Sequence, residues 1–137
     1  MAPSLGQFED NRFYFVYSRL VLQHMEPQYS RRYIGELIRI LTPEGLLIFQ
    51  IHSERDPASQ PPPPRKGARR LMSLARKRLR SVGWLPLRGF IPEMEMHGVP
   101  RPAVVNTVKQ SGGRVVDVDD DRSGGREWIS FRYLVTK

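Results

Sequence analysis

The chain has 137 residues, no cysteine and a formal net charge of +8 at pH 7. This length suits one domain, and the lack of cysteine excludes disulfide bonds and thiolate metal sites. No stretch approaches the roughly 20 apolar residues that cross a bilayer, and residues 1–11 do not resemble a signal peptide. These features predict a cytoplasmic protein.

The first half of the sequence predicts a β-α-β unit. Residues 13–17 are aromatic and β-branched, which is typical of a strand buried on both faces. Pro27 suits the first turn of a helix, and apolar residues then recur at helical spacing up to Leu41. After a turn at residues 42–45, the apolar run 46–51 predicts a second strand. Such units have a right-handed crossover, so we expect the two strands to be parallel.

The second half predicts a helix followed by a hairpin. Residues 100–111 have valines on one helical face, and the following Gly112 and Gly113 are typical of a helix C-terminus. Two short strands, 114–119 and 128–135, are close enough in sequence to pair antiparallel as a hairpin.

Residues at about 54–92 differ from the rest and predict an insertion. The proline run 61–64 favours an extended backbone. Residues 65–82 carry eight basic residues, with leucines at helical spacing. This pattern predicts a basic amphipathic helix, 65–80, inserted into the domain.

The order of these elements resembles the C-terminal half of the class I S-adenosylmethionine (SAM)-dependent methyltransferase fold, of the methyltransferase type 11/12-like kind. FYFVYSRLVLQHM, residues 13–25, is similar to the family's fourth strand and following loop, (F/Y)D-x-(V/I)-x-S-x-x-V-L-x-H. YIGELIRILTPEGLLIFQI, residues 33–51, resembles its next helix, Pro-Gly-Gly turn and fifth strand. Residues 96–121 and 128–137 resemble its last helix and hairpin. The resemblance implies a partial Rossmann-like α/β fold over residues 12–137, with parallel strands, a C-terminal antiparallel hairpin and an N-terminal tail at 1–11.

Three departures from the family pattern limit what the resemblance implies. Tyr14 stands where the family has an acidic residue. Glu44 replaces the first glycine of the Pro-Gly-Gly turn, so it must accept a type I turn or backbone strain. The glycine-rich loop and the acidic residue that hold SAM in the family have no counterpart. We therefore expect a truncated domain. Whether this chain is active by itself is a separate question.

The resemblance implies SAM as cofactor and methyl transfer to an unidentified acceptor. Ser18, Arg19 and Leu20 would lie along the methionyl part of SAM. His24 would lie on the methyl-transfer side, either as a general base or only packing at the start of the helix. His52, after the fifth strand, is either a substrate contact or a solvated loop residue.

No metal site is expected. The histidines at 24, 52 and 97 are isolated in sequence. The aspartates at 117, 119 and 121 are followed by Arg122, where a calcium loop needs glycine, and by Trp128, where it needs glutamate.

The basic helix has three interpretations: a solvated cover over the active site, a contact with an anionic membrane surface, or a nucleic-acid contact. Aromatic residues that stack on bases are absent from it, which disfavours the last. The residues that would meet an anionic surface are Arg65, Lys66, Arg69, Arg70, Arg76, Lys77, Arg78 and Arg80.

A non-enzymatic alternative therefore stands beside the methyltransferase. A non-catalytic remnant of the fold would act as a binding module for an anionic membrane surface or nucleic acid through the basic helix, which would make it peripheral at the membrane. In either case the strand 13–17 would form an exposed hydrophobic edge, and we expect it to cause self-association.

Overall fold

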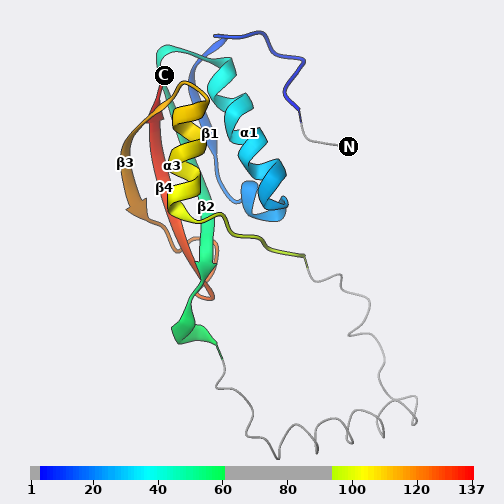
Figure 1. Cartoon of the computed structure of the whole chain (residues 1–137), viewed down its shortest axis with the longest axis vertical. Coiled ribbons are helices and arrows are strands. Elements are labelled where there is room, and N and C mark those ends of the chain that lie inside the picture. Colours follow the sequence, from blue (N-terminus) through cyan, green and yellow to red (C-terminus); the bar gives the residue numbers. More distant parts are fainter. Residues whose placement is uncertain (1–3, 61–93) are drawn as a thin grey trace, which may run out of the picture. The chain divides into compact units, whose positions relative to one another are not determined.

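The computed structural model describes residues 4–60 and 94–137 (Figure 1). The chain divides into two compact units. One is formed by Met1–Ser59 and Glu95–Lys137, and the other by Gln60–Met94. Every element described below belongs to the first unit. These elements are β1 (Phe13–Ser18), the 3₁₀ helix η1 (Leu22–His24), α1 (Pro27–Ile40), β2 (Leu41–Arg55), the 3₁₀ helix η2 (Pro57–Ser59), α3 (Arg101–Gln110), β3 (Arg114–Asp120) and β4 (Trp128–Thr136).

The four strands form one mixed sheet in the order β1-β2-β4-β3. Strand β1 pairs with β2 in parallel, while β4 pairs antiparallel with both β2 and β3. The predicted β-α-β unit and the predicted C-terminal hairpin are therefore both confirmed. The sheet brings β4 against β2, so the hairpin completes the sheet beside the parallel pair.

Strand β2 is longer than the predicted 46–51. It begins at Leu41, directly after α1, and its pairing with β1 jumps from Leu41 to Leu46. The turn at residues 42–45 is thus an irregularity within the strand. Glu44 has φ of 62°, so the strain predicted at this position is present. The strand also continues to Arg55, past the point where the insertion was predicted to begin.

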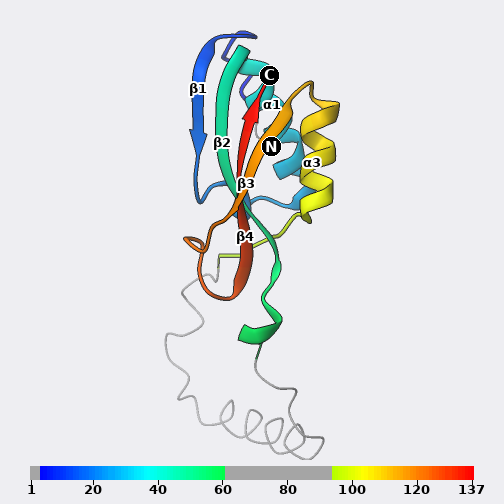
Figure 2. The same cartoon turned by 90° about the vertical axis from the view of Figure 1, so that its left-hand side faces the viewer.

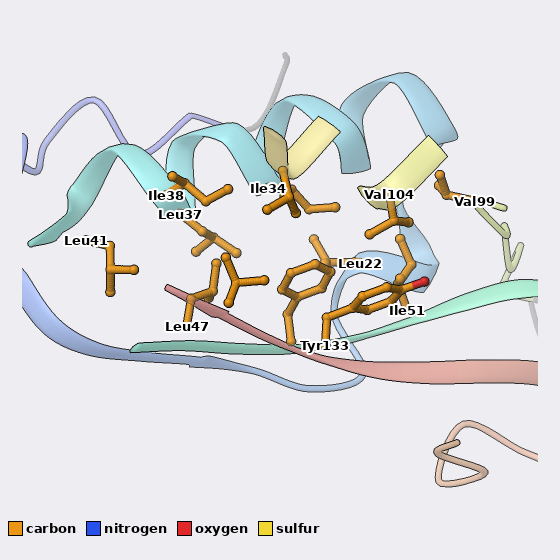
Figure 3. Close-up of a cluster of buried hydrophobic side chains, with 13 residues drawn as sticks. Leu22, Ile34, Leu37, Ile38, Leu41, Leu47, Ile51, Val99, Val104 and Tyr133 are labelled. Atoms are coloured by element: carbon orange, nitrogen blue, oxygen red, sulfur yellow. The ribbon is translucent and has the colours of Figure 1, made fainter. Parts of the chain in front are cut away.

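Helices α1 and α3 both lie on one face of the sheet (Figure 2). Alternate side chains of β2 point towards them, and the apolar face of α1 lies opposite, so the core fills the space between helices and strands (Figure 3). Burying each such side chain stabilises the fold by about 1.5–3 kcal/mol. The buried members are Leu22, Ile34, Leu37, Ile38, Leu41, Leu47, Phe49, Ile51, Val99, Val104, Val108, Tyr133 and Val135.

The opposite face of the sheet has no helix over it in the part of the chain that the structure describes (Figure 2). Tyr17, Ile48 and Leu134 line a hollow of about 240 Å³ there. The prediction that the first strand is buried on both faces is therefore wrong. Within β1, Tyr14, Phe15 and Tyr17 are 81%, 57% and 56% exposed. No described strand pairs with the outer edge of β1, and no described helix covers the face on which Tyr17 lies.

The described part of the predicted N-terminal tail is hydrogen-bonded to α1. The guanidinium of Arg39 donates hydrogen bonds to the carbonyl oxygens of Leu5 and Phe8 and to the Asp10 carboxylate. Arg39 also pairs with Glu36, and this hydrogen bond lowers the pKa of the Glu36 carboxyl. The segment before β1 is therefore part of the folded unit.

Candidate functional site

Three loops converge beyond the carboxyl ends of β1 and β2. The amide of His97 donates to the carbonyl of Gln23 at 2.8 Å, and the amide of Val99 donates to the carbonyl of His52 at 2.8 Å. The Arg19 side chain reaches Ser123, in the loop between β3 and β4, at 3.4 Å. Ligands of open α/β sheets bind beyond the carboxyl ends of parallel strands. This region is therefore the candidate site.

The predicted cofactor residues lie consecutively where β1 ends. Ser18 is the last residue of β1 and is buried, whereas Arg19 is exposed. Leu20 is 38% exposed and has φ of 59°, a conformation that costs a residue with a Cβ about 1–2 kcal/mol. The Leu20 amide donates to Oε1 of Gln50 at 3.2 Å, which holds the loop in this shape. The loop thus places the exposed guanidinium of Arg19 and the strained backbone of Leu20 at the site.

His24, the predicted base, is the last residue of η1 and is exposed. Its backbone amide donates to the carbonyl of Val21 at 3.2 Å. The side chain is therefore accessible at this end of the sheet. Its role as a general base stays a prediction.

His52 lies within β2 and not after it, and its side chain is completely buried. The ring stacks on Trp128 with centroids 4.9 Å apart, and Nδ1 lies 2.5 Å from the Ser130 hydroxyl. Burial, assisted by the charge of His24, lowers the pKa of His52 to about 4, so the ring is neutral at pH 7. The alternative of a solvated loop histidine is wrong, because β2 continues to Arg55. Its contact with substrate stays a prediction.

Two glutamines that the sequence analysis did not select lie beside His52. Gln23 and Gln50 are 3% and 2% exposed. Oε1 of Gln23, Nε2 of Gln50 and Nε2 of His52 are all buried without a hydrogen-bond partner among the described residues. Gln50 interrupts the apolar run 46–51, and that interruption is a signal that sequence reasoning can use. Gln23 carries no such signal.

Gly124, in the loop between β3 and β4, covers the buried histidine. A Cβ at this position would lie 2.2 Å from Cε1 of His52, and 3.1 Å from both Nε2 of His52 and Oε1 of Gln23. Only glycine permits this approach. The loop therefore lies directly on the polar edge of the His52 ring.

The acidic residues of β3 are exposed, and one of them pairs with a basic side chain. Asp119 pairs with Arg132 on β4 at 3.0 Å, and this pairing raises the pKa of the Arg132 guanidinium. Across residues 4–60 and 94–137, no three acidic, histidine or cysteine side chains lie close enough to hold a metal ion. The carboxylates of β3 instead form an exposed acidic edge.

The basic residues predicted to meet an anionic surface, Arg65 to Arg80, lie outside the described residues. None of the described helices is long and apolar enough to cross a membrane.

Residues 2–49 match the family model described as a methyltransferase domain. This match includes β1 and α1 and ends inside β2. Comparison with curated protein sequences gives no significant match.

Solved structures extend the likeness over the rest of the chain. Magnesium protoporphyrin IX methyltransferase from Synechocystis, with SAH bound, is 14% identical, has a TM-score of 0.58, and is matched over 100% of this chain and 50% of its own. A SAM-dependent methyltransferase from Methanosarcina mazei is 20% identical, has a TM-score of 0.61, and is matched over 100% of this chain and 64% of its own. The fold is that of a class I methyltransferase domain.

The chain spans only half to about two thirds of these methyltransferases. The [4+2]-cyclase SpnF shares the same fold, at 14% identity, a TM-score of 0.56, and coverage of 95% of this chain and 52% of its own. A protein named for cyclisation thus has the methyltransferase fold, so the fold alone does not specify the reaction.

Proposed function

We propose that this chain forms the C-terminal half of a SAM-dependent methyltransferase domain and binds the methionyl part of SAM. The observation that carries the proposal is the loop after β1, which presents exposed Arg19 and the strained Leu20 beyond the carboxyl end of a parallel strand. The methyltransferase-domain match over residues 2–49 includes this loop.

The residues at the site fit one part of the cofactor. The methionyl end of SAM carries a carboxylate, and a guanidinium such as that of Arg19 is a suitable partner for it. The ribose hydroxyls would need an acidic residue and the adenosyl part a glycine-rich loop, and neither has a counterpart in the sequence. We therefore propose that binding by this chain is partial.

SAM supplies a methyl group that an electron-rich acceptor atom can take by in-line displacement. The chain contributes positioning of the acceptor. Exposed His24 is the residue available to accept a proton from the acceptor, because the neutral His52 ring is buried behind the loop that carries Gly124.

Calorimetric titration of the chain with SAM tests this proposal. We expect saturable binding that Arg19→Ala weakens about tenfold, as the loss of one charge-assisted contact predicts. Arg114→Ala, at the start of β3, is the matched control because it removes an exposed arginine from another part of the sheet. The absence of saturable heat at millimolar SAM would refute the proposal.

For the basic segment we propose contact with an anionic membrane surface. Residues 61–90 contain nine lysines or arginines and no acidic residue, which is the observation that favours this second role. We expect co-sedimentation with vesicles that contain phosphatidylserine and none with vesicles of phosphatidylcholine alone. Equal binding to both vesicles, or release by nucleic acid at equal charge concentration, would contradict it.

A further inference from the structure

The buried polar atoms beside His52 have opposite hydrogen-bonding roles. Ser130 Oγ has Nδ1 of His52 as its hydrogen-bond partner, at 2.5 Å. A serine hydroxyl needs an acceptor for its proton, so Ser130 donates to Nδ1 and the ring proton of neutral His52 lies on Nε2. His52 Nε2 is thus a donor without a partner, and Gln23 Oε1 is an acceptor without a partner.

These two atoms also face the same small region. Each lies 3.1 Å from the point where a Cβ on Gly124 would stand. The two atoms therefore lie no more than about 6 Å apart. A single oxygen that makes two hydrogen bonds of about 2.9 Å each can bridge a separation up to that limit. A group between them has to accept a proton from Nε2 and donate one to Oε1. A hydroxyl does both.

In the structure, Gly124 of the loop between β3 and β4 lies against Cε1 of His52, beside these two atoms, so closely that a Cβ would not fit. Leaving a buried donor and a buried acceptor unpaired is unfavourable for the closed loop. Gly124 is followed by a second glycine, Gly125, whose φ of 112° is a conformation that residues with a side chain rarely adopt. The closed arrangement is thus poised for displacement by a group that satisfies both atoms.

We propose that His52 and Gln23 form a hydroxyl-binding subsite that the β3–β4 loop covers when empty. Its ligand class is a molecule with an aliphatic hydroxyl, which would lie beside the loop after β1. The identification of that molecule as the methyl acceptor rests on the function proposed above, whereas the subsite itself does not. Both residues would position the ligand and neither would react with it.

The test is an NMR titration of the whole chain with ethylene glycol, in the absence of SAM, observing the His52 ring nitrogens and the Gly124 amide. We expect a saturable shift of Nε2 and of the Gly124 amide. Gln23→Leu keeps the side-chain size but removes the acceptor, and should weaken binding about tenfold. Gln28→Leu, on the exposed side of α1, is the matched control and should leave binding unchanged.

Gly124→Ala provides an independent variant, because its Cβ cannot fit against His52 while the loop is closed. We expect this variant to bind ethylene glycol several-fold more tightly, since the loop no longer competes for the subsite. Circular dichroism checks that both variants are folded.

Two results would overturn the subsite. One is a shift that stays linear with ethylene glycol in the wild-type chain or is equally large in Gln23→Leu. The other is a structural water that occupies the site permanently. It would give a cross-peak between water and the Nε2 proton, and this cross-peak would persist when ethylene glycol is added. Because SAM is absent, failure of SAM binding would leave this result unaffected.

Discussion

His52 is held neutral by its surroundings, and this makes the stability of the fold depend on pH. Its ring is completely buried against Trp128, and burial lowers its pKa from 6.5 to about 4. The unfolded chain takes up a proton near pH 6.5 and the folded chain does not. Protonation therefore favours the unfolded state between these two values.

We predict that the contribution of His52 to the free energy of unfolding is constant above pH 6.5. It should fall by about 1.4 kcal/mol per pH unit as the pH decreases towards 4, a loss of roughly 3 kcal/mol in all. Urea unfolding between pH 7.5 and 4 measures it. His52→Phe should remove this part of the slope.

The matched control is His97→Gln, which replaces a partly exposed histidine on the neighbouring segment and should keep the slope. An unchanged slope in His52→Phe would show that other groups cause the pH dependence.

At the scale of elements, the junction between α1 and β2 combines a tight turn with strand pairing. Glu44 adopts φ of 62° there, and its amide donates to the carbonyl of Lys137 at 3.1 Å. The Lys137 ammonium in turn donates to the carbonyls of Arg39 and Leu41. The last residue of the chain thus holds the end of α1 and the beginning of β2 together.

We predict that Glu44→Gly stabilises the protein. Glycine removes the left-handed strain of about 1–2 kcal/mol but adds backbone entropy to the unfolded chain, so the net gain should be about 0.5–1 kcal/mol. Thermal or urea unfolding measures this. Gly45→Ala is the contrasting variant and should destabilise, because a Cβ there would lie 2.8 Å from the Thr42 carbonyl oxygen. A loss of stability in Glu44→Gly would contradict the strain.

The elements themselves could be predicted because local sequence determines them. The apolar spacing of Ile34, Leu37 and Ile38 specifies the buried side of α1, and the alternation of β4 specifies its inner face. The extension of β2 to Arg55 could not be predicted, because beyond Ile51 its residues are polar.

The candidate site was predicted only in part for the same reason. The loop after β1 was found from its resemblance to a known pattern. Gln23 and His52 are buried by loops distant in sequence, one of which contains Gly124. Burial of a polar side chain by such loops is a tertiary effect that periodicity does not report.

At the scale of the described molecule, the two edges of the sheet differ in charge. Strand β1, from Phe13 to Ser18, has no charged residue, and its exposed side chains are aromatic. The opposite edge, β3, carries Asp117, Asp119 and Asp120. Charged residues protect an edge strand from pairing with other chains, and β1 lacks this protection.

We therefore predict that the chain self-associates through β1. Sedimentation velocity over a range of concentrations should show dimers or larger species, and Phe15→Lys should shift the chain towards monomer. Val116→Lys, also at an exposed apolar residue but on the acidic edge, is the matched control and should have no effect. A wild-type chain that stays monomeric at its highest soluble concentration would refute the prediction.

Backbone hydrogen bonds hold the chain on both sides of residues 60–94 at or near one end of the β2–β4 pair. The amide of Asp56 donates a hydrogen bond to the carbonyl of Glu127 at 2.8 Å. The amide of Val99 donates one to the carbonyl of His52 at the same distance. The span between these anchors can therefore lengthen or shorten without altering strand register. Since each doubling of a loop adds only about 0.6 kcal/mol of closure cost, the domain can acquire new sequence at this junction with little loss of stability.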